Sequence, residues 1–249
     1  MADQIQANSE FNQSVDQSLV SPYRAEIMRR LVSTAFTKKI RALEIGTWFG
    51  SGSTRIWLES LPDNSELTLI DSWIPYSSNA DKDLDGMYAS KWDYIKMDSQ
   101  SNDALLSTIS IIKKFESEQN NKKVSLIRSS STFLQLLKDD IFDFIFIDGD
   151  HKYETVKKDI IEAKRLANKK FSIICGDDLE KVPTENLLEI SRNYLDRDYL
   201  GGEYGFHPGV CLAVSEELGE VNMSNGFWWV TYKKGSLTNN YLRNEQLKY

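Results

Sequence analysis

Two short acidic clusters, each directly after an apolar run, are the residues of this sequence best suited to chemistry. The apolar runs are residues 142–147 and 171–175, and the clusters after them are Asp148-Gly149-Asp150-His151 and Gly176-Asp177-Asp178. Apolar stretches of this length bounded by glycine are typical of buried strands. Carboxylates gathered at strand ends are costly unless a positive partner holds them, so the clusters indicate a divalent metal, a cationic ligand or both.

A glycine-rich turn and a later aspartate form a second candidate site. The turn contains Gly46, Gly50 and Gly52, and glycine lets the backbone bend sharply and approach a ligand. This spacing departs from Gly-x-Gly-x-x-Gly, which weakens a nicotinamide interpretation. Asp71 ends the next predicted strand, where it could accept hydrogen bonds from both hydroxyls of a ribose or cap the following segment. The order strand, turn, helix, strand and acid favours ribose binding.

Strands and helices alternate along most of the chain. We predict strands at 42–45, 67–70, 124–127, 142–147 and 171–175, and helices at 22–36, 53–60, 132–137 and 153–166. Repeated units of this size imply an α/β fold with a parallel sheet that helices cover on both faces. The ligand crevice of such a sheet lies beyond the carboxyl ends of the strands, where both acidic clusters fall.

The C-terminal part breaks this alternation. Residues 220–223 and 227–232 flank Ser224-Asn225-Gly226, and Asn-Gly between apolar runs is a strong hairpin signal. A parallel sheet completed by an antiparallel hairpin is the topology of class I methyltransferases and, less often, of dinucleotide-binding folds.

We expect one large domain with appendages. Residues 1–37 form an N-terminal arm and a cap helix, and residues 38–249 form the main domain. Residues 74–123 interrupt the alternation with several aromatic residues and a helix from about 103 to 118, and we expect a lid over the crevice. A surface insertion without a function is the alternative.

Composition excludes several classes of function. The net charge of −7 and the isoelectric point near 5.1 argue against a nucleic-acid partner, which requires clustered Lys and Arg. Two cysteines are too few for a disulfide framework and fit a reducing cytoplasm. The polar N-terminus and the lack of a long apolar run predict neither a signal peptide nor a membrane span. We therefore expect a cytoplasmic protein, and a homo-oligomer stays open.

Taken together, the motifs resemble those of class I S-adenosylmethionine-dependent methyltransferases. They comprise residues 44–57, 69–73, 143–159 and 173–178. Within this class they are most similar to metal-dependent small-molecule O-methyltransferases of the macrocin and sugar-modifying type. The resemblance implies a Rossmann-like, mostly parallel seven-stranded sheet with a C-terminal antiparallel hairpin, and S-adenosylmethionine as cofactor. It does not extend to residues 1–37 or 74–123.

The resemblance also implies which residues bind the cofactor. Glu44 and Gly46 would lie near its methionine part, Asp71 would hold the ribose, and residues 129–131 would lie near the adenine. The cofactor-binding residues that we predict are Glu44, Gly46, Thr47, Gly50, Ser53, Asp71, Ser72, Ser130 and Asp148.

The metal ligands and the base follow from the same resemblance. Asp148, Asp177 and Asp178 match the positions of the family's metal ligands, and Mg²⁺ prefers such oxygen ligands. Asp150 matches the residue proposed as general base. His151 could share that role because its ordinary pKa is near neutral.

Alternatives exist for several of these residues. Asp150 could cap the helix at 153–166, and His151 could be a positioning residue. His207, in the glycine-rich stretch 201–207, could belong to a second substrate loop or to a surface turn.

The sequence thus predicts Mg²⁺-assisted O-methylation of a small polar acceptor, such as a sugar or a natural-product intermediate. A bound Mg²⁺ would lower the pKa of the acceptor hydroxyl and fix its direction. A relative with other chemistry, such as a hydroxylase-like protein or an N-methyltransferase, is one alternative. A non-catalytic cofactor-binding or scaffold protein is another, although it has no need of a dense carboxylate cluster.

Overall fold

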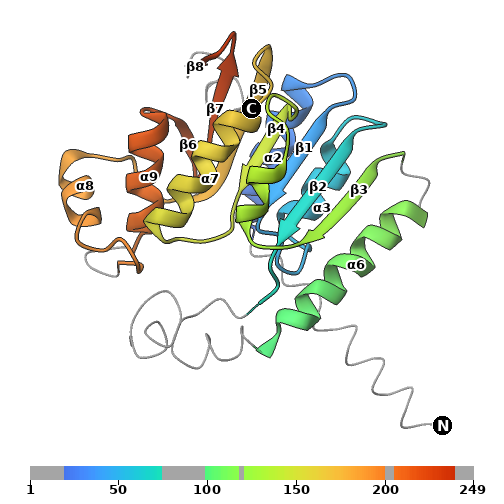
Figure 1. Cartoon of the computed structure of the whole chain (residues 1–249), viewed down its shortest axis with the longest axis horizontal. Coiled ribbons are helices and arrows are strands. Elements are labelled where there is room, and N and C mark those ends of the chain that lie inside the picture. The colour runs from blue at the N-terminus through green and yellow to red at the C-terminus, as the bar shows by residue number, and fades with distance from the viewer. Residues whose placement is uncertain (1–19, 75–98, 118–120, 200–204, 239–249) are drawn as a thin grey trace.

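The computed structural model describes residues 20–74, 99–117, 121–199 and 205–238, and these form an α/β fold around one sheet (Figure 1). The strands run in the order β3-β2-β1-β4-β5-β7-β6, and β8 pairs with β7. They are β1 (Arg41–Ile45), β2 (Glu66–Asp71), β3 (Lys123–Arg128), β4 (Phe144–Ile147), β5 (Phe171–Leu179), β6 (Asn222–Ser224), β7 (Gly226–Lys233) and β8 (Ser236–Thr238). The first five strands pair in parallel, and the last three pair antiparallel.

Helices cover both faces of this sheet (Figure 1). They are α2 (Pro22–Ala35), α3 (Ser53–Ser60), α6 (Ser101–Ser117), the 3₁₀ helix η1 (Ser131–Leu136), α7 (Tyr153–Leu166), α8 (Glu185–Ser191) and α9 (Pro208–Leu218). Alternate residues of β4 point to opposite faces, so Phe144 and Phe146 pack with α2 and α3, whereas Ile145 and Ile147 pack with α7 and α9. The central strands β1, β4 and β5 are therefore buried on both sides, as their continuous apolar runs predict, whereas no residue of the edge strand β3 is fully buried.

The predicted α/β fold, a mostly parallel sheet with a C-terminal antiparallel hairpin, is confirmed, with several local differences, among them helices α8 and α9, which the sequence interpretation did not include. The segment at 132–137 is a 3₁₀ helix rather than an α-helix. Strand β5 continues through Asp177 and Asp178 to Leu179, because β7 offers a partner beyond Gly176 across an irregular register. An eighth short strand, β8, joins the expected seven after a tight turn at Lys234 and Gly235.

The C-terminal hairpin forms where the Asn-Gly pair predicts it. Asn225 and Gly226 both have positive φ, at 51° and 85°, which suits the two-residue turns that join twisted antiparallel strands. Most of the predicted lid, residues 75–98 and 118–120, lies outside the described residues, and so do residues 1–19 of the predicted arm.

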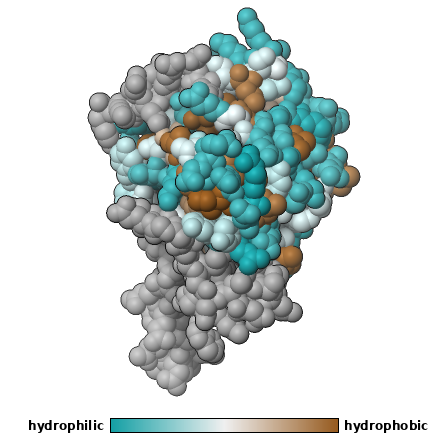
Figure 2. All heavy atoms as spheres, turned by 90° about the vertical axis from the view of Figure 1, so that its left-hand side faces the viewer, coloured by the Kyte–Doolittle hydropathy of each residue, from teal (hydrophilic) through white to brown (hydrophobic). Residues whose placement is uncertain are grey.

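The described surface is mixed. Seen from the side of α8 and α9, it is mainly hydrophilic, with apolar residues in small separate groups (Figure 2). Such scattered apolar residues are normal for a solvated surface. Within the described ranges, no helix is long and apolar enough to cross a membrane.

Candidate active site

A cavity of about 500 Å³ lies beyond the carboxyl ends of the parallel strands. Every residue predicted for the site lines this cavity except Glu44; the others are Gly46, Thr47, Gly50, Ser53, Asp71, Ser72, Ser130, Asp148, Asp150, His151, Asp177 and Asp178. The glycine turn and both acidic clusters therefore share one site, as the sequence predicts.

The glycine turn packs directly against the loop after β4. Gly46 has φ +85°, and a Cβ atom there would lie 1.9 Å from the carbonyl oxygen of Asp148. Only glycine allows these two segments to meet. On the outer side, Thr108 and Ser107 of α6 donate hydroxyl hydrogen bonds to the carbonyls of Trp48 and Phe49, at 2.8 and 2.9 Å.

Asp71 holds the turn in place. One of its carboxylate oxygens accepts hydrogen bonds from the backbone N–H groups of Thr47 and Trp48, both at 2.8 Å, and the other accepts from the N–H of Trp73 at 2.8 Å. Asp71 therefore also caps the following segment, which was the alternative interpretation of this residue. Because Asp71 also lines the cavity, the same carboxylate can contact a ligand there.

Thr47 presents an unsatisfied polar group to this end of the cavity. The residue is only 6% exposed, and its hydroxyl has no hydrogen-bond partner among the described residues. A buried polar group without a partner costs free energy, so a ligand atom at this position would be favourable. Helix α3 begins nearby at Ser53, and the N-terminus of a helix offers N–H groups that can bind an anion.

Glu44 lies behind the cavity wall. Its carboxyl group is fully buried and accepts hydrogen bonds from the hydroxyls of Ser53, at 2.5 Å, and Thr54, at 2.7 Å. Burial raises the pKa of Glu44 to about 8, so the group is largely neutral at pH 7. In this arrangement Glu44 ties the start of α3 to β1.

The acidic end of the cavity contains three carboxylates that affect one another. Burial, together with the charges of Asp177 and Asp178, raises the pKa of Asp148 well above its ordinary value. Burial and the Asp178 charge raise the pKa of Asp177 to about 6, although Arg24 opposes this rise. Arg24 of the cap helix α2 forms a 2.6 Å ion pair with Asp177. One positive partner that the clusters require is thus an arginine of the chain itself.

His151 supplies a second positive partner. Its Nε2 lies 3.1 Å from Asp178 and its Nδ1 lies 3.3 Å from Asp198. Burial alone would lower the pKa of His151, but these two carboxylates raise it well above the ordinary value. Conversely, although burial opposes it, His151 holds the pKa of Asp178 below its ordinary range. Because both of its ring nitrogens lie at carboxylates, His151 is better suited to a positioning role than to that of a base.

Asp150 lies at the entrance to α7 without being its N-cap. It accepts hydrogen bonds from the backbone N–H groups of His151, at 2.8 Å, and Lys152, at 3.2 Å, and Lys152 is the N-cap residue. The side chain is partly exposed and faces the cavity, where an acceptor could reach it.

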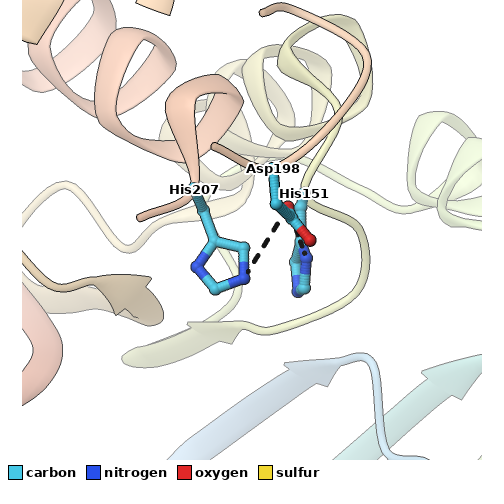
Figure 3. Close-up of side chains that lie close together, drawn as sticks. All are labelled: His151, Asp198 and His207. Atoms are coloured by element: carbon cyan, nitrogen blue, oxygen red, sulfur yellow. Dashed lines mark hydrogen bonds and ion pairs between the residues drawn. The ribbon is translucent and has the colours of Figure 1, made fainter. Parts of the chain in front are cut away.

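Among the described residues, two groups of histidines and carboxylates have side-chain atoms close enough together to bind one metal ion. One group is His151, Asp198 and His207 (Figure 3), and the other is Asp178, Glu180 and His207. Asp148 and Asp177, predicted as metal ligands, belong to neither group.

Residues 43–179 match a protein family described as a methyltransferase domain. The protein belongs to this family. The predicted enzyme class, a methyltransferase, is thereby confirmed. A search among curated proteins found no significant match.

Solved structures agree on the fold of this methyltransferase. An O-methyltransferase from Bacillus cereus in complex with SAH is 17% identical, with 94% of this chain and 90% of that chain covered and a TM-score of 0.51. A cofactor-bound protein from MTB is 15% identical, with coverages of 92% and 89% and a TM-score of 0.51. A protein from Corynebacterium glutamicum is 13% identical, with coverages of 93% and 88% and the same TM-score. At such identities the likeness concerns the fold alone.

Asp159 is a residue of the methyltransferase site that the sequence interpretation missed. It lines the cavity from α7 and is 3% exposed. Burial raises its pKa to about 7, with smaller contributions from Asp150 and Glu162, while a hydrogen bond with Ser131 opposes the rise. A signal was present, because Asp159 lies three residues after the buried Val156 on the apolar face of the helix.

Proposed function

We propose that this methyltransferase binds S-adenosylmethionine at the glycine turn and methylates a hydroxyl group of a small polar acceptor at the acidic end of the cavity. One observation carries the proposal: the turn, Asp71 and both acidic clusters line the same cavity. The complex of the Bacillus cereus O-methyltransferase with SAH lends support through the shared fold.

The cofactor end of the cavity fits the donor. The unpartnered Thr47 hydroxyl and the N-terminus of α3 suit the polar methionine part, and Asp71 suits the ribose hydroxyls. Ser130, with its neighbours in the loop after β3, lines the cavity where the adenine would lie. S-adenosylmethionine would supply a methyl group on a sulfonium, which leaves as a neutral thioether.

The residues of the chain must align the acceptor and remove its proton. Methyl transfer is an in-line displacement, so alignment of the two reacting atoms accounts for much of the acceleration. We assign the proton of the acceptor hydroxyl to the Asp150 carboxylate, which is partly exposed and faces the cavity. His151, held by Asp178 and Asp198, positions the neighbouring carboxylates.

We further propose that Asp148, Asp177 and Asp178 hold Mg²⁺ during catalysis. The three carboxylates form a hard oxygen donor set, which suits this ion, and a cation would relieve the repulsion that raises the pKa of Asp148 and Asp177. The ion would lower the pKa of the acceptor hydroxyl. Asp177 would then contact two positive groups, the Mg²⁺ ion and the guanidinium of Arg24, which donates a hydrogen bond to Oδ1 of Asp177.

Cofactor binding tests the first part of the proposal. We expect calorimetric heat and a thermal shift when the purified full chain is titrated with S-adenosylmethionine or S-adenosylhomocysteine. Thr47→Val, which keeps the volume but removes the hydroxyl, should weaken binding about tenfold, which corresponds to the loss of one hydrogen bond. Absence of heat and of any shift with both compounds would overturn the assignment.

Product mass and metal removal test the second part. Methylation adds the mass of CH₂ to an acceptor, whereas a hydroxylase-like relative would add that of oxygen. Turnover that persists unchanged in a chelator would remove Mg²⁺ from the mechanism. A product methylated on nitrogen would leave the cofactor assignment intact and replace the acceptor class.

A further inference from the structure

Both histidines of the chain, His151 and His207, meet at the edge of the cavity. Their ring centroids are 4.0 Å apart, although 56 positions separate the residues in the sequence. His207 is 6% exposed and lies at the N-cap of α9, so it belongs neither to a surface turn nor to a solvated loop.

A short antiparallel bridge pairs His207 with Asp198. Tyr199 and Phe206 exchange backbone hydrogen bonds of 3.0 and 2.9 Å. In antiparallel pairing, the residue before Tyr199 lies opposite the residue after Phe206. Asp198 and His207 are these two neighbours, and their side chains point toward each other (Figure 3). Asp198 is 8% exposed, so water does not readily satisfy its carboxylate.

A glycine brings His151 to the same point. Gly209 is the second residue of α9, and a Cβ atom there would lie 2.1 Å from the carbonyl oxygen of His151 and 2.5 Å from the nitrogen of Tyr153. The starts of α7 and α9 therefore approach more closely than any larger residue would permit. This close approach places both imidazoles beside Asp198 (Figure 3).

Each histidine has one ring nitrogen at a carboxylate and the other facing Asp198. The nitrogen Nε2 of His151 lies 3.1 Å from Asp178, and Nδ1 of His207 lies 2.6 Å from Glu180. The second nitrogens lie 3.3 Å (His151) and 3.7 Å (His207) from Oδ1 of Asp198. Metal-binding histidines use this pattern, in which an outer carboxylate fixes the ring so that the other nitrogen faces the ion.

His151 lies within hydrogen-bond distance of Asp198, at 3.3 Å, whereas the separation between His207 and Asp198 suits two ligands of one ion better than a hydrogen bond. A distance of 3.7 Å between His207 and Asp198 is too long for a hydrogen bond. Ligands on a tetrahedral zinc ion, with bonds of about 2.0–2.2 Å, lie about 3.3–3.6 Å from one another. The separations of the His151 and His207 nitrogens from the Asp198 oxygen, 3.3 and 3.7 Å, are close to that spacing, and all three atoms lie within 4.8 Å of one another.

We propose that His151, His207 and Asp198 form a site for a borderline divalent cation of the Zn²⁺ type, distinct from the carboxylates assigned to Mg²⁺. Two imidazoles and one carboxylate select such ions over Mg²⁺, which prefers oxygen ligands. Three protein ligands leave a fourth position for water or a ligand atom. Because His151 and Asp178 line the cavity, the ion lies at its wall. The inference does not depend on methyl transfer.

Metal binding to the full, untagged chain tests this site directly. After removal of metal by a chelator, Co²⁺ serves as the probe because a low-coordinate Co²⁺ site with nitrogen ligands gives strong visible absorption. We expect one equivalent of Co²⁺ per chain, displaced by Zn²⁺ but not by millimolar Mg²⁺. His207→Gln and Asp198→Asn should each weaken Zn²⁺ binding at least 100-fold, and Glu180→Gln, which removes only the orienting carboxylate, about tenfold.

Asp177→Asn provides the matched control. It changes a buried carboxylate of the same cavity that does not belong to the site, so Co²⁺ absorption should persist while any Mg²⁺ effect is lost. No visible Co²⁺ band and no stoichiometric Zn²⁺ binding by the wild-type chain would overturn the proposal, whatever the variants do. Equal Zn²⁺ affinity of wild type and Glu180→Gln would also count against it. Failure to bind S-adenosylhomocysteine, measured separately, would affect only the proposed function.

Discussion

The two ends of the cavity are built by different means. At the end with the glycine turn, contacts of the backbone form the structure: Gly46 allows a close approach, and N–H groups of the turn bind Asp71. At the acidic end, charged side chains from distant segments neutralise one another, as Arg24 and Asp177 do. Contacts of the backbone within a turn can be predicted from the local sequence. Pairs of charged side chains depend instead on which distant segments the fold brings together.

The sharpest test of the backbone-built end is Gly46→Ala. The added Cβ would overlap the carbonyl of Asp148, and φ +85° is unfavourable for alanine, so we expect a loss of at least about 4 kcal/mol in the free energy of unfolding or failure to fold. Urea denaturation measures this loss. Gly219→Ala is the control, since its φ is +71° but a Cβ there meets nothing within 4 Å. It should cost about 1–3 kcal/mol, the strain of this backbone conformation alone, and equal losses for the two variants would refute the close-approach argument.

At the charge-built end, the corresponding test is Arg24→Met. It leaves the buried carboxylate of Asp177 without its guanidinium, and removing one partner of a buried ion pair costs about 3 kcal/mol. Arg29 lies on the same helix and pairs with the more exposed Glu59, so Arg29→Met should cost less than about 1 kcal/mol. Chemical denaturation of both variants gives the comparison. Similar small losses would mean that Arg24 contributes little to the acidic end.

Asp71→Asn tests whether the turn depends on a charged acceptor. The amide offers one acceptor oxygen in place of two, so at least one of the N–H groups of Thr47, Trp48 and Trp73 loses its partner. We expect a loss of about 2 kcal/mol and weaker binding of S-adenosylhomocysteine. In the control variant Asp143→Asn, an acceptor of the Arg41 N–H is changed away from the cavity. Its cofactor affinity should equal that of wild type, and a loss there would point to a general effect on stability.

The spacing of apolar residues within short stretches of the sequence was sufficient to predict most strands and several helices. Helices α3 and α7 begin and end at the predicted residues, because their apolar spacing and flanking turns are confined to short windows. That Asp71 and the glycine turn lie at the same edge of the sheet was predictable for the same reason, since they stand at the ends of consecutive parallel strands. The extension of β5 through Asp177 was not, because it depends on β7, far along the chain.

The partners of the acidic clusters could not be predicted from local pattern. Arg24 and Asp177 are 153 positions apart, and no periodicity connects them. His207 and Asp198 meet through one short bridge, and His151 reaches them through one close contact between helices. The sequence therefore indicated that a positive partner was needed but not which residue would provide it.

Asp159 lies where the two ends meet, and its titration gives the smallest expected effect. Its pKa is raised to about 7 by burial, with Asp150 and Glu162 adding to the rise and Ser131 opposing it. The folded state therefore binds this proton more tightly than the unfolded state, where the ordinary value is 3.8. The stabilisation is complete below the unfolded pKa and is lost as pH rises through about 7.

Asp159→Asn should remove this dependence. Between pH 6 and pH 7 the wild-type chain should lose about 1 kcal/mol of unfolding free energy relative to the variant, because the neutral amide cannot release a proton. Urea titrations of both proteins at several pH values measure the difference. Glu162→Gln is the control, since it removes a minor neighbouring charge and should lower the pKa of Asp159 only slightly. Parallel pH profiles for wild type and Asp159→Asn would show that this carboxyl is ionised throughout this pH range. Asp159 would then belong with the charges of the acidic end rather than with the end that is built from backbone groups.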